Sequence, residues 1–101
     1  MTIKSQFSNQ DKTLTISIGE LFNFKLLDEF RQTYLDPRAR QADIVIDLRQ
    51  TRGMDSSALG MLLNMQQHLG RDNGQIRIIN ASPDIKRILF IARFDKKFRI
   101  E

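Results

Sequence analysis

Three consecutive polar residues at the centre of the run MDSSALG are the best candidates for a chemical role in this chain. They are Asp55, Ser56 and Ser57. A serine hydroxyl is a phosphorylation site, and a neighbouring carboxylate adds to the local negative field. The same residues precede an apolar helical pattern, where a serine or an aspartate serves as the N-cap that satisfies free backbone amides. The residue types alone leave both roles open, a helix cap and a modifiable site.

The chain lacks the residues that catalysis and metal binding usually need. The chain has no cysteine, which excludes disulfides, thiolate catalysis and cysteine metal sites, and agrees with a cytoplasmic protein. Its only histidine is His68, so the chain lacks the residues to build a zinc site or a Ser/His triad. Ser56 has neither a histidine base nearby nor a glycine-rich oxyanion loop. We therefore expect no enzymatic activity, no cofactor and no metal.

Length and composition are those of a folded domain. The 101 residues are 41% hydrophobic and 28% charged, which suits one domain over residues 1–101 with a single modest core. The sequence has no run of 18 apolar residues and no charged start followed by an apolar stretch, so neither a membrane span nor a secretory signal is predicted. We expect a cytoplasmic monomer with no membrane association.

The net charge of +4 raises the alternative of nucleic-acid binding. Basic residues are interleaved with acids along most of the chain, and only a stretch near the end is predominantly basic. A mixed charged tail of this kind is usually a solvated face, and no RRM, KH or zinc-finger pattern accompanies it. Nucleic acid is therefore not an expected partner. The basic residues of that stretch are Lys86, Arg87, Arg93, Lys96, Lys97 and Arg99.

Alternating apolar and polar residues predict the strands. Residues 13–18 (TLTISI) alternate strictly, which is typical of a strand buried on one face. Residues 42–49 (ADIVIDLR) show the same alternation, and residues 75–80 (QIRIIN) predict a third strand. Residues 3–7 and 98–100 add two shorter strands at the ends of the chain.

Three segments have helical spacing. The first covers residues 23–36, where Asn23 serves as the cap and Pro37 ends the helix. The second covers residues 56–69. The third begins at Ser82, which is followed by a proline at the first helical position and an acid beside the positive helix end.

Strands that alternate with helices imply parallel strands joined by right-handed crossovers. Because the strands alternate instead of being apolar throughout, only one face of the sheet should be heavily covered. The prediction is an α/β fold with a small, mixed, mostly parallel sheet and helices mainly on one face.

The helix predicted over residues 56–69 is apolar over an arc of roughly 200°, wider than a one-sided core stripe needs, so part of it should reach the surface. Met54, Met61 and Met65 either form an adaptable contact patch or fill the core. Gly60 falls on the polar side and costs about 1 kcal/mol against alanine. Close approach by another backbone is one reason for a glycine there, and chance is the other.

The run VIDLRQTRGMDSSALGMLL, residues 45–63, resembles the STAS domain of bacterial anti-sigma-factor antagonists, also called anti-anti-sigma factors. In that family an acidic residue followed by two hydroxyl residues opens this helix. The resemblance extends over nearly the whole chain and implies the STAS fold over residues 1–101. Further matching segments are Gly19-Glu20-Leu21 after the first alternating strand and Ser82-Pro83 with Lys86-Arg87 at the last helix start.

The resemblance implies a phosphorylation switch at Ser56, because in the family the serine directly after the acidic residue is phosphorylated by a kinase that is itself the anti-sigma factor. A PP2C-type phosphatase reverses the modification, and Ser57 is the unmodified neighbour. The unphosphorylated protein is then expected to bind its kinase and the phosphorylated protein to release it. The expected partner-binding residues are Asp55, Ser57, Met54, Ala58, Gly60, Met61, Phe22 and Asn23.

Two positions depart from the family pattern. The aspartate usual after the G-x-L turn is Phe22 here, and the glycine usual after the serine pair is Ala58. The first departure alters a surface that is expected to face the kinase. The letters FNF at 22–24 with FR at 30–31 resemble relatives paired with response regulators that carry kinase or phosphatase modules. The alternative function is therefore control of biofilm or motility output through such a regulator, without direct sigma control.

A receiver domain is a further competing interpretation, because the run IDLRQTRGMD resembles a strand that ends in a phosphoacceptor aspartate. Receivers need an acidic cluster after their first strand to hold magnesium, and a lysine after a later strand. The first adjacent acidic pair of this chain, Asp28-Glu29, falls inside a predicted helix. The pattern therefore does not favour a receiver.

Overall fold

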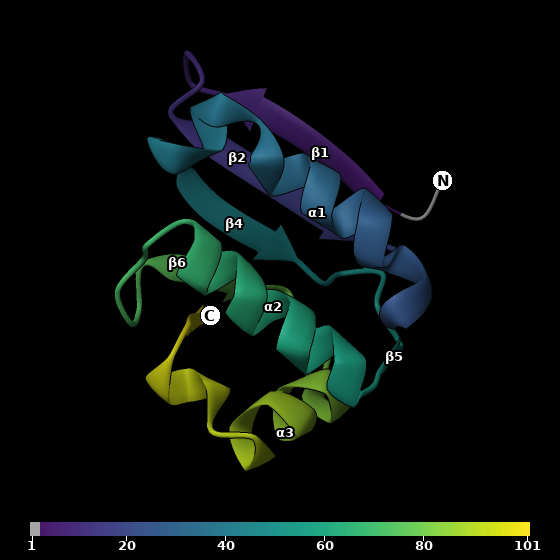
Figure 1. The fold of residues 1–101 in the computed structure, drawn as a ribbon. Coiled ribbons are helices and arrows are strands. Elements are labelled where there is room, and N and C mark those ends of the chain that lie inside the picture. Colours follow the sequence, from purple (N-terminus) through teal and green to yellow (C-terminus); the bar gives the residue numbers. More distant parts are fainter. Residues whose placement is uncertain (1–2) are drawn as a thin grey trace.

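A computed structural model describes residues 3–101 of the chain and contains a five-stranded sheet in the order β1-β2-β4-β6-β7 (Figure 1). β1 and β2 form an antiparallel pair, and each of the other neighbours is parallel. This is the predicted mixed, mostly parallel sheet. Its strands are β1 Ile3–Ser8, β2 Thr13–Ile18, β4 Asp43–Asp47, β6 Ile76–Ile79 and β7 Arg99–Ile100.

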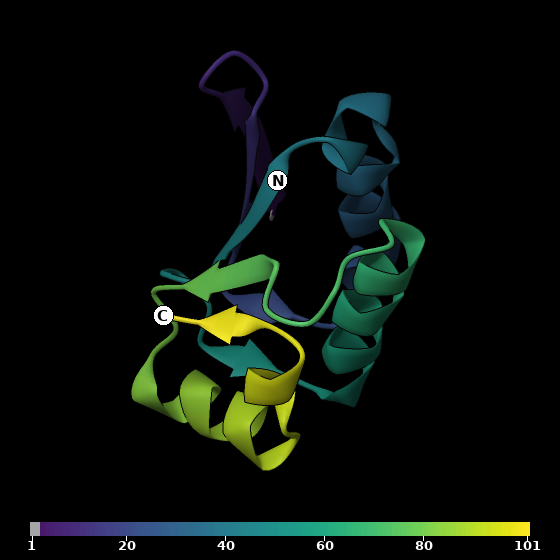
Figure 2. The ribbon, with the colours of Figure 1, turned by 90° about the vertical axis from the view of Figure 1, so that its left-hand side faces the viewer.

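Three α-helices connect the strands, α1 Leu27–Leu35, α2 Ser56–His68 and α3 Pro83–Ile91. Figure 2 shows α1 and α2 together on one side of the sheet, with α3 apart from them near β7. No helix of residues 3–101 is long and apolar enough to cross a membrane. Short 3₁₀ helices and a two-stranded ladder complete the fold: η1 Phe24–Leu26, η2 Pro37–Arg40, η3 Phe94–Lys96, β3 Leu21–Phe22 and β5 Gly53–Met54.

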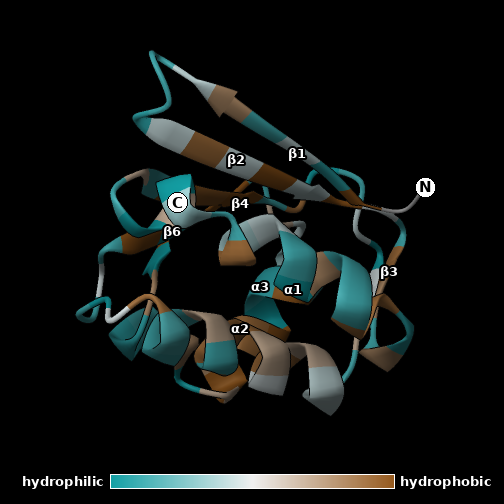
Figure 3. Ribbon diagram, turned by 45° about the horizontal axis from the view of Figure 1, so that its top comes forward, coloured by the Kyte–Doolittle hydropathy of each residue, from teal (hydrophilic) through white to brown (hydrophobic). Residues whose placement is uncertain are grey.

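Hydrophobic and hydrophilic residues alternate along β2 (Figure 3), and the burial of its side chains follows this alternation as predicted. Leu14, Ile16 and Ile18 of β2 are at most 1% exposed, whereas the threonines and the serine between them are half-buried. Val45 of the central strand β4 points to the opposite face and is nevertheless buried. Its cross-strand neighbours on that face are Thr15 and the long side chain of Arg77.

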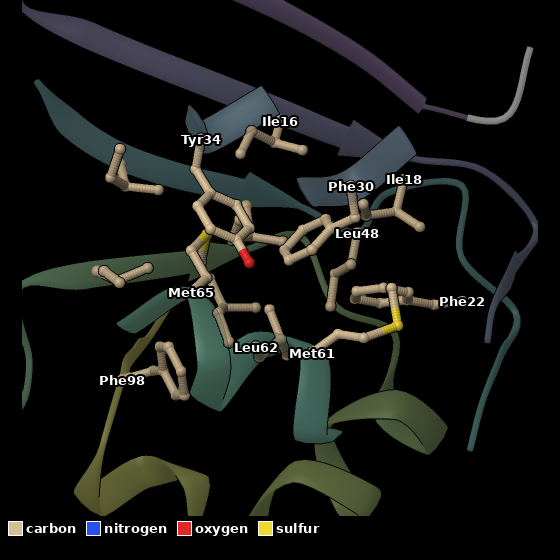
Figure 4. Close-up of a cluster of buried hydrophobic side chains, with 14 of the residues drawn as sticks. Ile16, Ile18, Phe22, Phe30, Tyr34, Leu48, Met61, Leu62, Met65 and Phe98 are labelled. Carbon is tan, nitrogen blue, oxygen red and sulfur yellow. The ribbon is translucent and has the colours of Figure 1, made fainter. Parts of the chain in front are cut away.

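Aromatic and aliphatic side chains fill the space between the sheet and the two helices α1 and α2 (Figure 4). Phe30 of α1 is the centre of an aromatic row, with its ring centroid 5.3 Å from that of Phe22 and 5.7 Å from that of Tyr34. The His68 ring extends the row at 5.4 Å from Tyr34. Buried aromatic side chains contribute much of the apolar area of a core this small, so this row is a main support of the fold.

The first predicted helix differs from the observed one. Asn23 caps the 3₁₀ helix η1, because its Oδ1 accepts the Lys25 amide at 3.0 Å, and α1 begins only at Leu27. Pro37 does more than end α1, since it starts η2, which Asp36 caps by accepting the Arg38 amide at 2.9 Å. Prolines fit the first turn of a helix, so a new short helix forms where only a stop was predicted.

The third helix confirms its prediction. The Ser82 hydroxyl oxygen accepts the Ile85 amide at 3.2 Å, and Pro83 is the first helical residue. The strand predicted over residues 42–49 is shorter than expected. It ends at Asp47, whose carboxylate accepts the Arg49 amide at 3.0 Å and so turns the chain away from the sheet.

Candidate functional site

The start of α2 distinguishes the two neighbouring serines. Asp55 is the N-cap, with its Oδ1 accepting the Ala58 amide at 3.2 Å and the Ser57 hydroxyl at 2.5 Å. Ser57 is half-buried and its hydroxyl is engaged. Ser56 is the first helical residue and is exposed, and its hydroxyl has no hydrogen bond within residues 3–101. Of the two hydroxyls, only that of Ser56 is free to react.

The hydrogen-bond partners of Asp55 favour the ionised form of its carboxyl group. The Ser57 hydroxyl holds the pKa of the Asp55 carboxyl below its usual value, and the amides of Ala58 and Ser57 add to the effect. Asp55 is therefore ionised at neutral pH and directs a negative charge at the positive end of α2, where an anion is stabilised. The structure thus resolves which residue caps the helix, which the sequence left open.

The loop before α2 is tied to the preceding parts of the chain by backbone hydrogen bonds. The amides of Arg52 and Gly53 both donate to the Glu20 carbonyl, at 2.7 and 3.1 Å. Thr51 is 2% exposed, and its hydroxyl donates to the Ile18 carbonyl at 3.3 Å. These bonds hold the middle of the loop against the end of β2 and the turn after it, three residues before Ser56.

The small β3–β5 ladder brings a second segment next to the helix start. Leu21 pairs with Gly53, Phe22 pairs with Met54, and the Asp55 amide donates to the Phe22 carbonyl at 3.4 Å. A Cβ atom on Gly53 would lie only 2.9 Å from Cδ2 of Leu21, so the glycine allows the two segments to approach closely. The residues that follow Phe22 therefore lie beside the start of α2.

Two large apolar side chains of this second segment are exposed. Leu21 is 59% exposed and Phe24 is 67% exposed. Sequence reasoning missed both. Strand alternation offered a signal for Leu21, since a buried Phe22 places Leu21 on the outer face. It offered none for Phe24, which begins η1. Exposed phenylalanine and leucine side chains so close together are a feature of binding surfaces.

Three of the residues expected to contact a partner are buried. Phe22 and Ala58 are 0% exposed, and Met61 is 4% exposed. Phe22 packs against Phe30, and Met61 reaches toward Phe22 in the core (Figure 4). The site of the usual family aspartate is thus an inward position of β3, where an aromatic side chain is stabilised by burial. Met65 is also fully buried, so of the two roles that the sequence left open for the methionines, Met61 and Met65 have that of core packing.

The outer side of α2 carries the remaining candidates. Leu59 and Leu63 are half-buried at the margin of the core, as the wide apolar arc predicts. Gly60 is exposed, and a Cβ atom built on it meets no atom within 4 Å. The fold itself therefore has no steric need for a glycine at this position.

The last two candidates lie before α2. Met54 and Asn23 are half-buried, and the side chain of Asn23 caps η1.

The only histidine is part of the packing around α2. His68 lies twelve residues after Ser56 on the same helix, about 18 Å away at the rise of an α-helix. A base at this distance cannot accept the proton of the Ser56 hydroxyl. Within residues 3–101, no group of three His, Cys, Asp or Glu side chains is placed to hold a metal ion.

Residues 5–101 match the STAS domain family, and the chain belongs to it. A relative from Pseudomonas aeruginosa (strain UCBPP-PA14), the STAS-domain containing protein PA14_20770, is 39% identical over 100 residues, which cover 99% of each chain. The family that the sequence motifs indicate is thereby confirmed.

Solved structures of anti-sigma factor antagonists have the same fold. One from Mycobacterium paratuberculosis has a TM-score of 0.73 over 97% of this chain and 84% of its own, at 19% identity. Unphosphorylated SpoIIAA has a TM-score of 0.62 at 16% identity, covering 88% of this chain and 82% of that chain. Phosphorylated Bacillus SpoIIAA has a TM-score of 0.63 at 13% identity, covering 98% and 90%. The chain is a STAS domain that resembles these antagonists.

Proposed function

We propose that this protein is a non-catalytic partner switch, an anti-sigma-factor antagonist that binds a serine kinase when unphosphorylated and releases it when Ser56 is phosphorylated. The observation that carries the proposal is the contrast at the start of α2, where the Ser56 hydroxyl is exposed and free while that of Ser57 is bound to Asp55. The kinase is the anti-sigma factor, and a PP2C-type phosphatase restores the binding form.

The fold tolerates the modification. A phosphoserine brings up to two negative charges to the first residue of α2, where the helix dipole and terminal amides stabilise an anion by up to about 2 kcal/mol. SpoIIAA has been solved in unphosphorylated and phosphorylated forms, and the two match this chain with TM-scores of 0.62 and 0.63. Phosphorylation at Ser56 therefore acts on the binding surface while the domain stays folded.

Electrostatic repulsion is large enough to reverse binding. One phosphate charge at about 5 Å from a partner carboxylate, with an effective dielectric near 20, costs roughly 3 kcal/mol. That cost weakens affinity about a hundredfold. The ionised Asp55 beside the phosphate increases the negative field, so a partner whose contact surface is acidic or apolar is expelled.

The contact surface consists of Ser56 and the exposed residues around it, Leu21, Phe24 and Gly60. Leu21 and Phe24 offer an apolar anchor beside the switch. Gly60 leaves room for a partner backbone one turn further along α2, because no atom of residues 3–101 lies within 4 Å of where its Cβ would be. The buried residues Phe22, Ala58 and Met61 support this surface from below.

The exposed Phe24 also favours the alternative partner, a response regulator that carries a kinase or phosphatase module and acts on biofilm or motility output without direct sigma control. The family aspartate is replaced by the buried Phe22, and the exposed side chains on either side of it, Leu21 and Phe24, are apolar. A kinase adapted to this surface needs an apolar pocket there, which distinguishes it from a kinase that recognises an aspartate.

The test is co-purification from cells of the native organism with tagged variants. Ser56→Ala is expected to retain one protein with a serine-kinase domain, and Ser56→Asp is expected to lose it. Ser57→Ala is the matched control, because it removes a neighbouring hydroxyl without touching Ser56, and it should retain the kinase. Equal recovery of the kinase by the Ser56→Ala and Ser56→Asp proteins, or recovery by neither, contradicts the proposal.

A further inference from the structure

The outer side of α3 carries two neighbouring exposed apolar side chains, Phe90 and Ile91. Ile85 and Leu89 of this helix are fully buried, whereas Phe90 is 49% exposed and Ile91 is 77% exposed. The next residue, Ala92, is exposed as well. α3 lies at the margin of the molecule (Figure 1), where these three side chains are exposed.

Positive charge surrounds the apolar side chains. Five cations and two acids lie between residues 84 and 97. Within residues 3–101 none of these five cations forms an ion pair, whereas Arg38, Arg77 and Arg99 elsewhere do. The cations are Lys86, Arg87, Arg93, Lys96 and Lys97, and the acids are Asp84 and Asp95.

Helical spacing places charge and apolar surface side by side. Arg87 and Ile91 are four residues apart, as are Lys86 and Phe90, so each pair lies on one stripe of α3. Arg93 follows in the left-handed conformation, with φ of 61°, and its amide donates to the Phe90 carbonyl at 3.0 Å. Glycine is the usual residue at such a helix end, so an arginine is kept here at a conformational cost. These residues form what we term the α3 face, made of Lys86, Arg87, Phe90, Ile91 and Arg93.

We propose that the α3 face is a second docking surface, which binds an acidic protein segment carrying apolar side chains, independently of the state of Ser56. Acidic residues of that segment complement the unpaired cations, and its apolar side chains cover Phe90 and Ile91. A second copy of this chain does not fit, because the same face on both copies is positively charged.

Other anionic ligands fit the face less well. A membrane needs a wider apolar face to insert, and the apolar stripe of α3, Ile85 with Leu89, is already buried in the core. Nucleic acid uses the cations and can stack a base on the Phe90 ring, but it gains little from covering Ile91, which is the more exposed of the two apolar side chains and has no ring. An acidic protein segment uses both the charges and the two exposed apolar side chains.

The test is a titration of the ¹⁵N-labelled full chain, followed by NMR, with a synthetic peptide of alternating glutamate and leucine. The backbone amides of the α3 face are expected to shift and those of residues 55–60 to stay in place. A lysine-leucine peptide and a glutamate-serine peptide are the controls and should bind about tenfold more weakly, because each lacks one of the two complementary features.

Variants locate the surface. Ile91→Ser and Arg87→Glu are expected to weaken the peptide about tenfold, and Ser56→Asp should leave its affinity unchanged. The matched controls Leu35→Ser and Arg31→Glu alter an exposed leucine and an exposed arginine of α1 and should change it less than twofold. Absence of saturable binding, or shifts centred on residues 55–60, overturns the proposal. So does preferential binding of phosphatidylserine vesicles or duplex DNA in parallel titrations.

Discussion

A series of glycine-to-alanine substitutions tests the account of α2 most sharply, because the same methyl group should have opposite effects at different positions. Gly60 lies inside α2, and its added Cβ atom meets nothing within 4 Å. The substitution Gly60→Ala should therefore gain the full difference in helix propensity, about 1 kcal/mol. For a chain of this length that gain raises the melting temperature by about 4–8 °C.

Two other glycines are controls, because alanine at these positions should lower the melting temperature instead of raising it. Gly74 has φ of 86°, a conformation that disfavours alanine, so Gly74→Ala should lower the melting temperature. Gly53→Ala places its methyl group 2.9 Å from the end of the Leu21 side chain, which is flexible and exposed, so the loss should be small. Thermal unfolding followed by circular dichroism measures all three proteins.

The reasoning fails if Gly60→Ala unfolds at the same temperature as the parent or below it. Such a result would mean that the fold itself needs this glycine, and the open space above it would no longer indicate a partner. A stabilised Gly60→Ala protein should in turn retain less kinase in the co-purification assay, because its methyl group occupies the surface where a partner backbone approaches.

Three further perturbations have expected outcomes. Asp55→Ala should destabilise the protein at neutral pH and not in acid. The folded-state pKa of Asp55 lies below its ordinary value of 3.8, so its ionised carboxylate stabilises the fold above pH 3.8. This stabilisation is lost as the pH falls through the folded-state pKa. Urea unfolding from neutral pH down to acid checks this, and a constant difference from the parent contradicts it. Ser82→Ala should cost about 1 kcal/mol by removal of the α3 cap, measured in the same way, whereas Ser56→Ala should stay within about 0.5 kcal/mol. Phe30→Ala removes the centre of the aromatic row and should cost about 3–5 kcal/mol; a loss below about 1 kcal/mol in urea unfolding would refute its place in the core.

Local patterns predicted most of the fold. The strict alternation of residues 13–18 matches β2 over the same range, and the serine-proline start of α3 is observed at Ser82. Both signals depend on neighbours in sequence. The start of α1 was predicted wrongly because Asn23 can cap either an α-helix or a 3₁₀ helix, and the choice depends on burial of Leu26 in the tertiary structure.

The candidate site was predicted in position and only partly in composition. The acidic cap and its two serines are local features, so Ser56 could be placed at the start of α2 from sequence alone. The burial of Phe22 and the exposure of Phe24 depend on the β3–β5 ladder, which joins residues that are far apart in the chain. A helical projection of α2 also could not show that Met61 turns inward, because its apolar arc is wider than the core contact.

The central claim is that Ser56 is the residue that is modified, and phosphopeptide mapping by tandem mass spectrometry tests it most directly. The tagged chain is recovered from cells of its own organism, with Ser56→Ala and Ser57→Ala variants in parallel. The account predicts phosphate on Ser56 in the parent and in the Ser57→Ala protein, none in the Ser56→Ala protein, and its removal by a PP2C-type phosphatase. Phosphate on Ser57 or on a threonine, or no phosphate on the parent protein, would contradict the account.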